Sequence, residues 1–174
     1  MEPREVLELL RAQYHDFLNC LQVISGLVDL GRPEKIKEYI RQAADEFAAR
    51  GRVAKAGLPE IACLLLQFQA EAVADGIKVS PDLQRASEDT VPETAFLQHF
   101  HRAAVAQASE SGEERRLTIT GRSVPEGYAL TYSGPFAWEK VKEAVAETAA
   151  ASGVRIEVSG EEKIMVFLPV KDNE

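Results

Sequence analysis

The sequence predicts an α+β protein in which an N-terminal helical hairpin is followed by an α/β sandwich. The first observation is a heptad repeat of apolar residues near the N-terminus, which is typical of helices packed side by side in a bundle. The second is the mixture of helical and strand patterns beyond about residue 58, which indicates helices on one face of a mixed sheet. Together they predict two domains, residues 1–55 and residues 56–174.

The hairpin is predicted from apolar spacing and from a helix stop. Apolar residues recur in alternating steps of four and three, at Leu10, Tyr14, Phe17, Leu21, Ile24 and Val28. Gly31 ends the first helix and Pro33 opens a second that runs toward Gly51, since glycine terminates helices and proline fits their first turn. One hairpin cannot bury this apolar seam alone, so we expect two copies to form a dimeric four-helix bundle.

The second domain is predicted from shorter patterns. An apolar helix opens at Pro59 and ends at Gly76, and residues 81–93 are polar and predict a loop. Further helices are expected over 94–109 and 138–152. Strands are expected over 77–80, 116–121, 128–133, 154–160 and 163–170.

Composition restricts the classes of function. The chain is 45% hydrophobic and 28% charged, as in ordinary globular proteins. Its net charge is −8 and its basic residues are scattered, which argues against nucleic acid or an anionic membrane as the main partner. No segment has the apolar length of a membrane span, and the first residues are acidic and amphipathic, so we expect a cytoplasmic protein.

A polar stripe on the first helix contains the strongest functional signal. At 100° per residue, a stripe of about 80° beside the apolar seam is formed by Arg11, His15, Asn19, Gln22 and Gly26. The stripe is expected to face solvent. A lone surface histidine ordinarily has no chemical role, so the neighbours of this one decide how it is interpreted.

Those neighbours suit a histidine that accepts a phosphoryl group. A neutral imidazole is a good nucleophile near pH 7. Asp16 follows His15 directly and can orient the ring, as carboxylates do for other histidines. Arg11, one turn earlier, can meet the phosphoryl oxygens, and Asn19, one turn later, can offer an uncharged hydrogen bond. We therefore predict His15, Asp16, Arg11 and Asn19 as the catalytic residues.

The same segment resembles a known family. HDFLN followed by LQVISGLVDLGRPEKIKEYI resembles the phosphoacceptor hairpin of two-component histidine kinases of the citrate and dicarboxylate sensor type. It is also similar to the hairpin of the sporulation initiation phosphotransferase B family. In this resemblance His15 is the acceptor, and Asp16 and Asn19 occupy the matching acidic and asparagine positions.

The rest of the chain resembles the GHKL-type ATP-binding domain of those kinases, but without its nucleotide-binding boxes. His99 and Ala103 stand where the family has asparagines, and alanine offers no oxygen to Mg²⁺. Tyr132 replaces the adenine-binding aspartate, and Phe136 fills a glycine position. Only Gly153 remains of the phosphate loop, so the backbone cannot easily approach a triphosphate. We therefore expect a degenerate domain that binds no cofactor and does not use ATP.

This combination implies a histidine phosphotransferase of a sporulation phosphorelay. Such a protein takes a phosphoryl group from the aspartate of one response regulator onto His15 and passes it to another regulator. The Mg²⁺ is expected in the acidic pocket of the regulator's receiver domain. Two alternatives remain open: a non-catalytic dimeric adaptor or inhibitor of a two-component system, and a sensor kinase with a divergent ATP site.

Other patterns in the second domain are assigned to structure. His99 and His101 lie two residues apart, so they do not face each other on a helix, and a structural role is favoured over metal binding. Tyr132, Phe136 and Trp138 are expected in the core.

Overall fold

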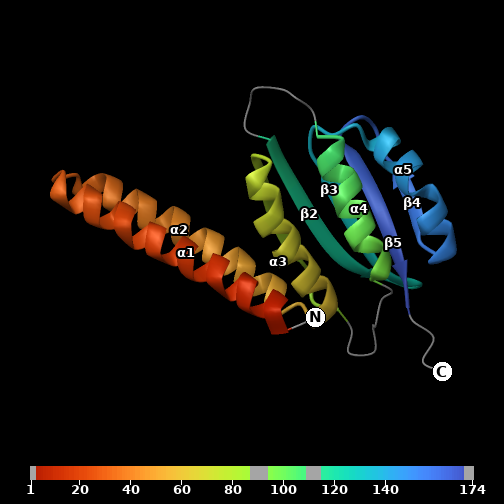
Figure 1. The fold of residues 1–174 in the computed structure, drawn as a ribbon, viewed down its shortest axis with the longest axis horizontal. Helices are drawn as coiled ribbons and strands as arrows, with labels where there is room; N and C mark the ends of the chain where they lie inside the picture. The colour runs from red at the N-terminus through yellow and green to blue at the C-terminus, as the bar shows by residue number, and fades with distance from the viewer. Residues whose placement is uncertain (1–2, 87–93, 109–114, 171–174) are drawn as a thin grey trace. The chain divides into compact units, whose positions relative to one another are not determined.

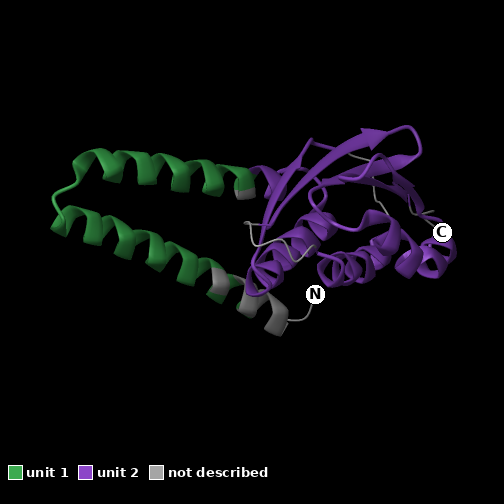
Figure 2. Ribbon diagram, turned by 90° about the horizontal axis from the view of Figure 1, so that it is seen from above, with its two compact units in different colours: residues 1–51 green, residues 52–174 purple. Residues whose placement is uncertain are grey.

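The computed structural model describes residues 3–86, 94–108 and 115–170 (Figure 1). The chain divides into two compact units between Gly51 and Arg52 (Figure 2), whereas the sequence placed the boundary between residues 55 and 56. The first unit is a hairpin of α1 (Pro3–Asp29) and most of α2 (Pro33–Ala54).

The turn of the hairpin is a Schellman motif, which explains why the chain reverses there. Gly31 has φ +61°, in the left-handed region that favours glycine. The N–H of Gly31 donates to the carbonyl of Val28 at 2.9 Å, and that of Arg32 donates to the carbonyl of Leu27 at 3.1 Å. Pro33 then begins α2, whose first turn needs no donor from that residue.

The end of α2 corrects the prediction. The helix was expected to run toward Gly51, but it continues through this glycine to Ala54. A glycine inside a helix costs about 1 kcal/mol, which is too little to end a helix that is held further on. Here Val53, which is fully buried in the core of the second unit, stabilises the last turn.

The second unit is an α/β sandwich with a five-stranded mixed sheet of order β1-β2-β3-β5-β4. β1 pairs in parallel with β2, and the other neighbours are antiparallel. The strands are β1 (Ile77–Leu83), β2 (Arg115–Val124), β3 (Gly127–Ser133), β4 (Arg155–Val158) and β5 (Lys163–Pro169). The helices are α3 (Pro59–Ala74), α4 (Ala95–Ala106) and α5 (Trp138–Ala151). The predicted α+β class is confirmed.

β1 is longer than predicted. Residues 81–83 were assigned to a loop, but Pro81 pairs with Ile119 and Leu83 with Gly121. Proline is tolerated because β1 is an edge strand, where one side of the backbone needs no partner. Leu83 is 6% exposed, so its burial favours continued pairing. Residues 84–86 have no regular secondary structure, as predicted, and the rest of the predicted loop, 87–93, lies outside the described residues.

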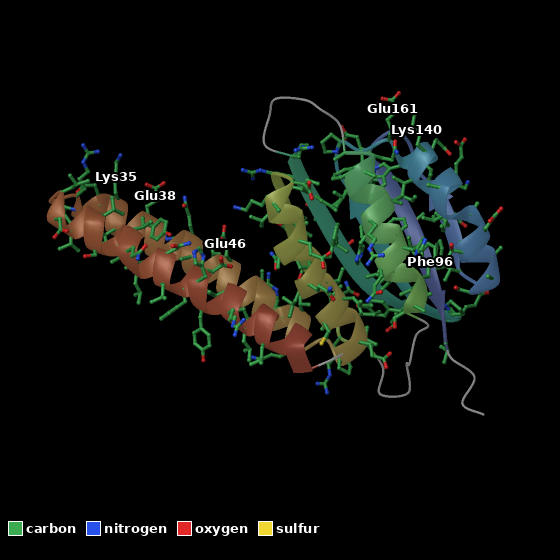
Figure 3. All side chains as sticks on the ribbon, viewed as in Figure 1. Lys35, Glu38, Glu46, Phe96, Lys140 and Glu161 are labelled. Carbon is green, nitrogen blue, oxygen red and sulfur yellow. The ribbon has the colours of Figure 1, made fainter. Side chains whose placement is uncertain are left out.

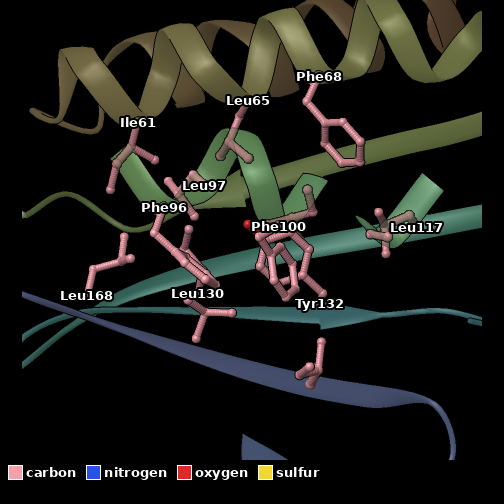
Figure 4. Close-up of a cluster of buried hydrophobic side chains, with 14 of the residues drawn as sticks. Ile61, Leu65, Phe68, Phe96, Leu97, Phe100, Leu117, Leu130, Tyr132 and Leu168 are labelled. Atoms are coloured by element: carbon pink, nitrogen blue, oxygen red, sulfur yellow. The ribbon is translucent and has the colours of Figure 1, made fainter. Parts of the chain in front are cut away.

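The helices of the second unit all cover the same face of the sheet (Figures 1 and 2). Inward residues alternate with outward ones, as the burial along β1 shows. The core combines Ile61, Leu65 and Phe68 of α3, Phe96 and Phe100 of α4, and Leu117, Leu130 and Tyr132 of the sheet (Figure 4). Among the residues labelled in Figure 3, Phe96 of α4 is buried, whereas Lys35 and Glu38 are exposed on α2.

None of the helices in the described ranges has a stretch long and apolar enough to cross a membrane.

Candidate functional site

His15 lies on the exposed surface of α1, as the stripe predicted. Its ring is held by the next turn of the same helix: Asn19 Nδ2 lies 3.1 Å from His15 Nδ1. Residues four apart on a helix are surface neighbours, so this contact needs no tertiary support. Asn19 therefore restricts the orientation of an imidazole whose other nitrogen, Nε2, remains directed away from it.

The donor and acceptor in this contact depend on the tautomer of His15. With Nδ2 of Asn19 donating to Nδ1, the neutral ring of His15 carries its proton on Nε2. A half-turn of the amide exchanges its oxygen and nitrogen, so that Oδ1 accepts from Nδ1–H and the lone pair moves to Nε2. Asn19 can thus stabilise either neutral form, which a carboxylate, having only acceptors, cannot do.

The other predicted site residues lie around His15 on α1. Arg11, Asp16 and Gln22 are exposed, and Gly26 is half-buried. Arg11 is one turn before His15, so its guanidinium can reach the same space above the ring. Within the described ranges no group of three or more His, Cys, Asp or Glu side chains is arranged to hold a metal ion.

The apolar seam beside the stripe is open in the single hairpin. Phe17 meets Phe47 of α2 with ring centroids 6.4 Å apart, yet both rings stay 41–50% exposed. Tyr14 is 68% exposed, Leu21 47% and Val28 58%. Packing of α1 against α2 therefore leaves an exposed apolar surface along the length of the helix, adjacent to the stripe.

The positions of the expected nucleotide boxes are occupied by packed side chains. Tyr132 is fully buried and its hydroxyl lies 3.0 Å from His101 Nε2. The His101 ring stacks on Phe68 at 4.1 Å, and Phe100 packs on Tyr132 at 4.7 Å. His99 is exposed and Ala103 is half-buried against the core. His101 and Tyr132 have the structural roles that the sequence favoured.

Packed side chains also fill the region around Phe136, which was expected at a glycine position of the nucleotide site. Phe136 stacks on Trp138 with centroids 4.9 Å apart, and Trp138 Nε1 donates to the carbonyl of Gly134 at 3.1 Å. Phe136 is 5% exposed and Trp138 2%, which confirms their predicted place in the core. A Cβ on Gly134 would lie 2.5 Å from the carbonyl oxygen of Arg116, so this turn packs directly against β2.

Sequence reasoning missed that His101 and Tyr132 are partners. They are 31 residues apart, and only the packing of α4 on β3 brings them together. Burial lowers the pKa of His101 to about 3 and raises the pKa of Tyr132, so both are neutral at physiological pH. The signal that was available is the apolar spacing of Phe96, Phe100 and His101, which puts the histidine on the inner face of α4.

The buried histidine predicts an acid-sensitive second unit. In the unfolded chain His101 titrates near 6.5, so below that pH the unfolded state binds a proton that the folded state does not. The contribution of neutral His101 to the free energy of unfolding is present above about pH 6.5 and is lost as the pH falls toward 3. The loss is about 2 kcal/mol between pH 7 and pH 5. Denaturant unfolding followed by Trp138, the single tryptophan, should show this loss.

The control for this titration is a variant that keeps the aromatic packing. His101→Phe combined with Tyr132→Phe removes both hydrogen-bonding groups together, so neither is left unsatisfied. Its stability should change less with pH than that of the unmodified protein, by the contribution of His101. Equal pH dependence in the two proteins would contradict the assignment.

The exposed histidine on a long hairpin helix, with an asparagine one turn on in contact with its ring, has the geometry that the sequence predicted for a phosphoacceptor site. Residues 1–56 match the family model described as the sensor kinase SpoOB-type, alpha-helical domain. The resemblance expected from the sequence is confirmed for the hairpin, and it supports a protein of a two-component system. No curated protein sequence matches the chain.

The solved structures to which the chain is similar include two histidine kinases and a bacterial phosphotransferase. The histidine kinase AdeS of Acinetobacter baumannii is 10% identical, with 91% of this chain and 98% of that chain covered and a TM-score of 0.45. The blue-light activated histidine kinase EL346 of Erythrobacter litoralis is 12% identical, with 98% and 61% covered and a TM-score of 0.42. A bacterial phosphotransferase is 10% identical, with 95% and 97% covered and a TM-score of 0.41.

Proposed function

We propose that this chain is a phosphotransferase of a two-component phosphorelay. His15 accepts a phosphoryl group from the aspartate of one receiver domain and passes it to the aspartate of another. The observation that carries the proposal is His15 itself: it is exposed, its Nδ1 is held by Asn19, and it lies in the hairpin that matches the SpoOB-type family. The similarity to the sporulation phosphotransferase family favours a relay that controls sporulation.

The transfer step needs the Nε2 lone pair. With Asn19 Oδ1 accepting from Nδ1–H, Nε2 of His15 attacks the phosphorus of the aspartyl phosphate. The N–P bond forms as the P–O bond to the aspartate breaks, and the aspartate leaves as a carboxylate. The ring then carries a positive charge, which the adjacent carboxylate of Asp16 stabilises, and Arg11 meets the phosphoryl oxygens. The reverse step phosphorylates the second receiver.

No nucleotide takes part in this cycle. Acyl phosphate and phosphoramidate are both high-energy, so the transfer is reversible and depends on alignment and charge stabilisation. The Mg²⁺ belongs to the acidic pocket of the receiver. The buried Tyr132 and Phe136, and the lack of an oxygen at Ala103, support a second unit that binds neither ATP nor Mg²⁺.

The active form is a homodimer. The exposed seam of Tyr14, Leu21 and Val28 supports it, because burying such residues fully is worth about 1.5–3 kcal/mol for each large aliphatic side chain. A second hairpin supplies the matching surface, since a symmetric pair presents the same seam twice. The resulting four-helix bundle leaves His15 of each copy at its outer surface.

A labelling experiment with two arms tests the proposal. In the first arm the protein is incubated with a receiver domain labelled on its aspartate, and label should pass to the protein as an acid-labile, alkali-stable phosphoramidate. Phosphorus–nitrogen NMR should place the phosphorus on Nε2. In the second arm Mg-ATP labelled at the γ-phosphate replaces the receiver, and no label should appear.

The two arms separate the alternatives. Label from the receiver and none from ATP is the expected result. Label from ATP would identify a sensor kinase with a divergent nucleotide site. No label in either arm, with receivers from the same organism, would leave the adaptor or inhibitor as the function.

A further inference from the structure

The outer face of the sheet has an unusual composition for a face that meets solvent. A sheet with one covered face normally places polar side chains on the other. Here the outward positions of β5 include Met165 and Phe167, both half-buried. Ala129, which pairs with Phe167 in the register, is only 2% exposed although it lies on the same outer row. The centre of this face is therefore apolar.

Arginines bracket that apolar centre. The register aligns Arg122 of β2, Ala129, Phe167 and Arg155 of β4 in one row across four strands. At a strand spacing of about 4.8 Å, the two arginines start roughly 14 Å apart. Lys163 adds a third cation on the outward side of β5. In a chain with a net charge of −8, three cations thus lie around this apolar patch, together with the two glutamates that pair with Arg155.

A hollow lies at one end of the row. It has a volume of about 280 Å³ and is lined by Val124, Pro125, Glu126, Arg155, Phe167 and Pro169. Its walls are mainly apolar, and the charged groups stand at its rim. This volume is large enough for one aromatic or branched aliphatic side chain.

The Phe167 ring orients the Arg155 side chain, but the ion pairs of Arg155 are weak enough to be replaced by others. Its guanidinium carbon lies 4.3 Å from the centroid of the Phe167 ring. Arg155 Nε lies 3.3 Å from Glu157 Oε1, and Arg155 Nη1 lies 3.8 Å from Glu126 Oε2. Both carboxylates are strongly exposed, at 49% and 82%. Exposed pairs of this kind contribute about 0–1 kcal/mol, so an incoming carboxylate can replace the longer one.

We propose that this face is a docking surface for an acidic protein partner, which inserts an apolar side chain into the hollow between its own carboxylates. Arginine, methionine and aromatic residues are the types enriched at protein interfaces. Nucleic acid fits less well, because Arg155 covers a face of the only outward aromatic ring among the described strands, Phe167.

The test uses the full-length protein and a peptide of four glutamates around one phenylalanine. Two-dimensional ¹H–¹⁵N NMR should show that the peptide shifts the backbone amide signals of Arg122, Ala129, Arg155 and Phe167. Arg122→Glu and Arg155→Glu should each weaken binding at least roughly tenfold, since each reverses a charge at the rim. Arg102→Glu changes an exposed arginine on α4, on the covered side of the sheet, and should bind as the unmodified protein does.

Several outcomes would overturn the proposal. One is that millimolar peptide causes no shifts on this face. Another is that the reversed-charge variants bind the peptide as tightly as the unmodified protein does. A third is that a peptide with lysines in place of the glutamates binds as tightly as the acidic one. Stronger shifts on this face with a short polyuridine strand would assign it to nucleic acid instead. If Arg122→Glu lowers the oligomeric state of the free protein, the occupant is a second copy of this chain. Thermal unfolding of each variant confirms that it is folded.

Discussion

Replacing His15 by alanine should abolish uptake of a phosphoryl group from a labelled receiver while leaving the protein folded. The side chain is exposed and its hydrogen bond to Asn19 lies at the surface, so little stability depends on it. What is lost is the nitrogen that forms the bond to phosphorus, and no neighbour replaces it. Label transfer is measured beside sedimentation, which should be unchanged.

The neighbours should give graded effects. Arg11→Ala and Asn19→Ala should slow transfer by about tenfold to a hundredfold, because each removes charge stabilisation or orientation and not the nucleophile. Asp16→Asn should lie between them and His15→Ala, since it keeps the shape but weakens the stabilisation of positive charge on the ring. His99→Ala, an exposed histidine on α4, is the matched control and should transfer normally. Uptake of label by His15→Ala at the normal rate would make the central assignment wrong.

Replacing Leu21 by aspartate should dissociate or unfold the proposed dimer. In a single hairpin Leu21 is 47% exposed, so a charge there would cost little, within about 0.5 kcal/mol. In a four-helix bundle the same carboxylate would be buried without a partner, at a cost of several kcal/mol. Ile24→Asp should behave alike. Sedimentation at micromolar concentration distinguishes the two cases.

A second substitution controls for the loss of apolar surface alone. Val23 is 42% exposed, close to the value for Leu21, but it lies on the side of α1 away from the seam. Val23→Asp should leave the dimer intact. A folded monomer before any substitution would contradict the proposed assembly, as would equal effects of the two changes.

The hairpin was predictable because its information is local. Heptad spacing, Gly31 and Pro33 determine two helices and the turn between them, and the structure contains each of these. The stripe around His15 depends on helical geometry alone, so its exposure and the contact with Asn19 also follow from positions along the chain. The extent of α2 did not follow, because Val53 holds its last turn through a tertiary contact.

The fold class, the order of helices and strands, and the histidine that faces solvent could all be predicted from the sequence, since each depends on periodicity over a few turns or pairs. The pairing of residues 81–83 with the sheet could not be predicted, because their partners on β2 lie more than thirty positions away. The same holds for the contact of His101 with Tyr132 and for the row from Arg122 to Arg155. Sheet register is a non-local property, and it places side chains together that no spacing in the sequence relates.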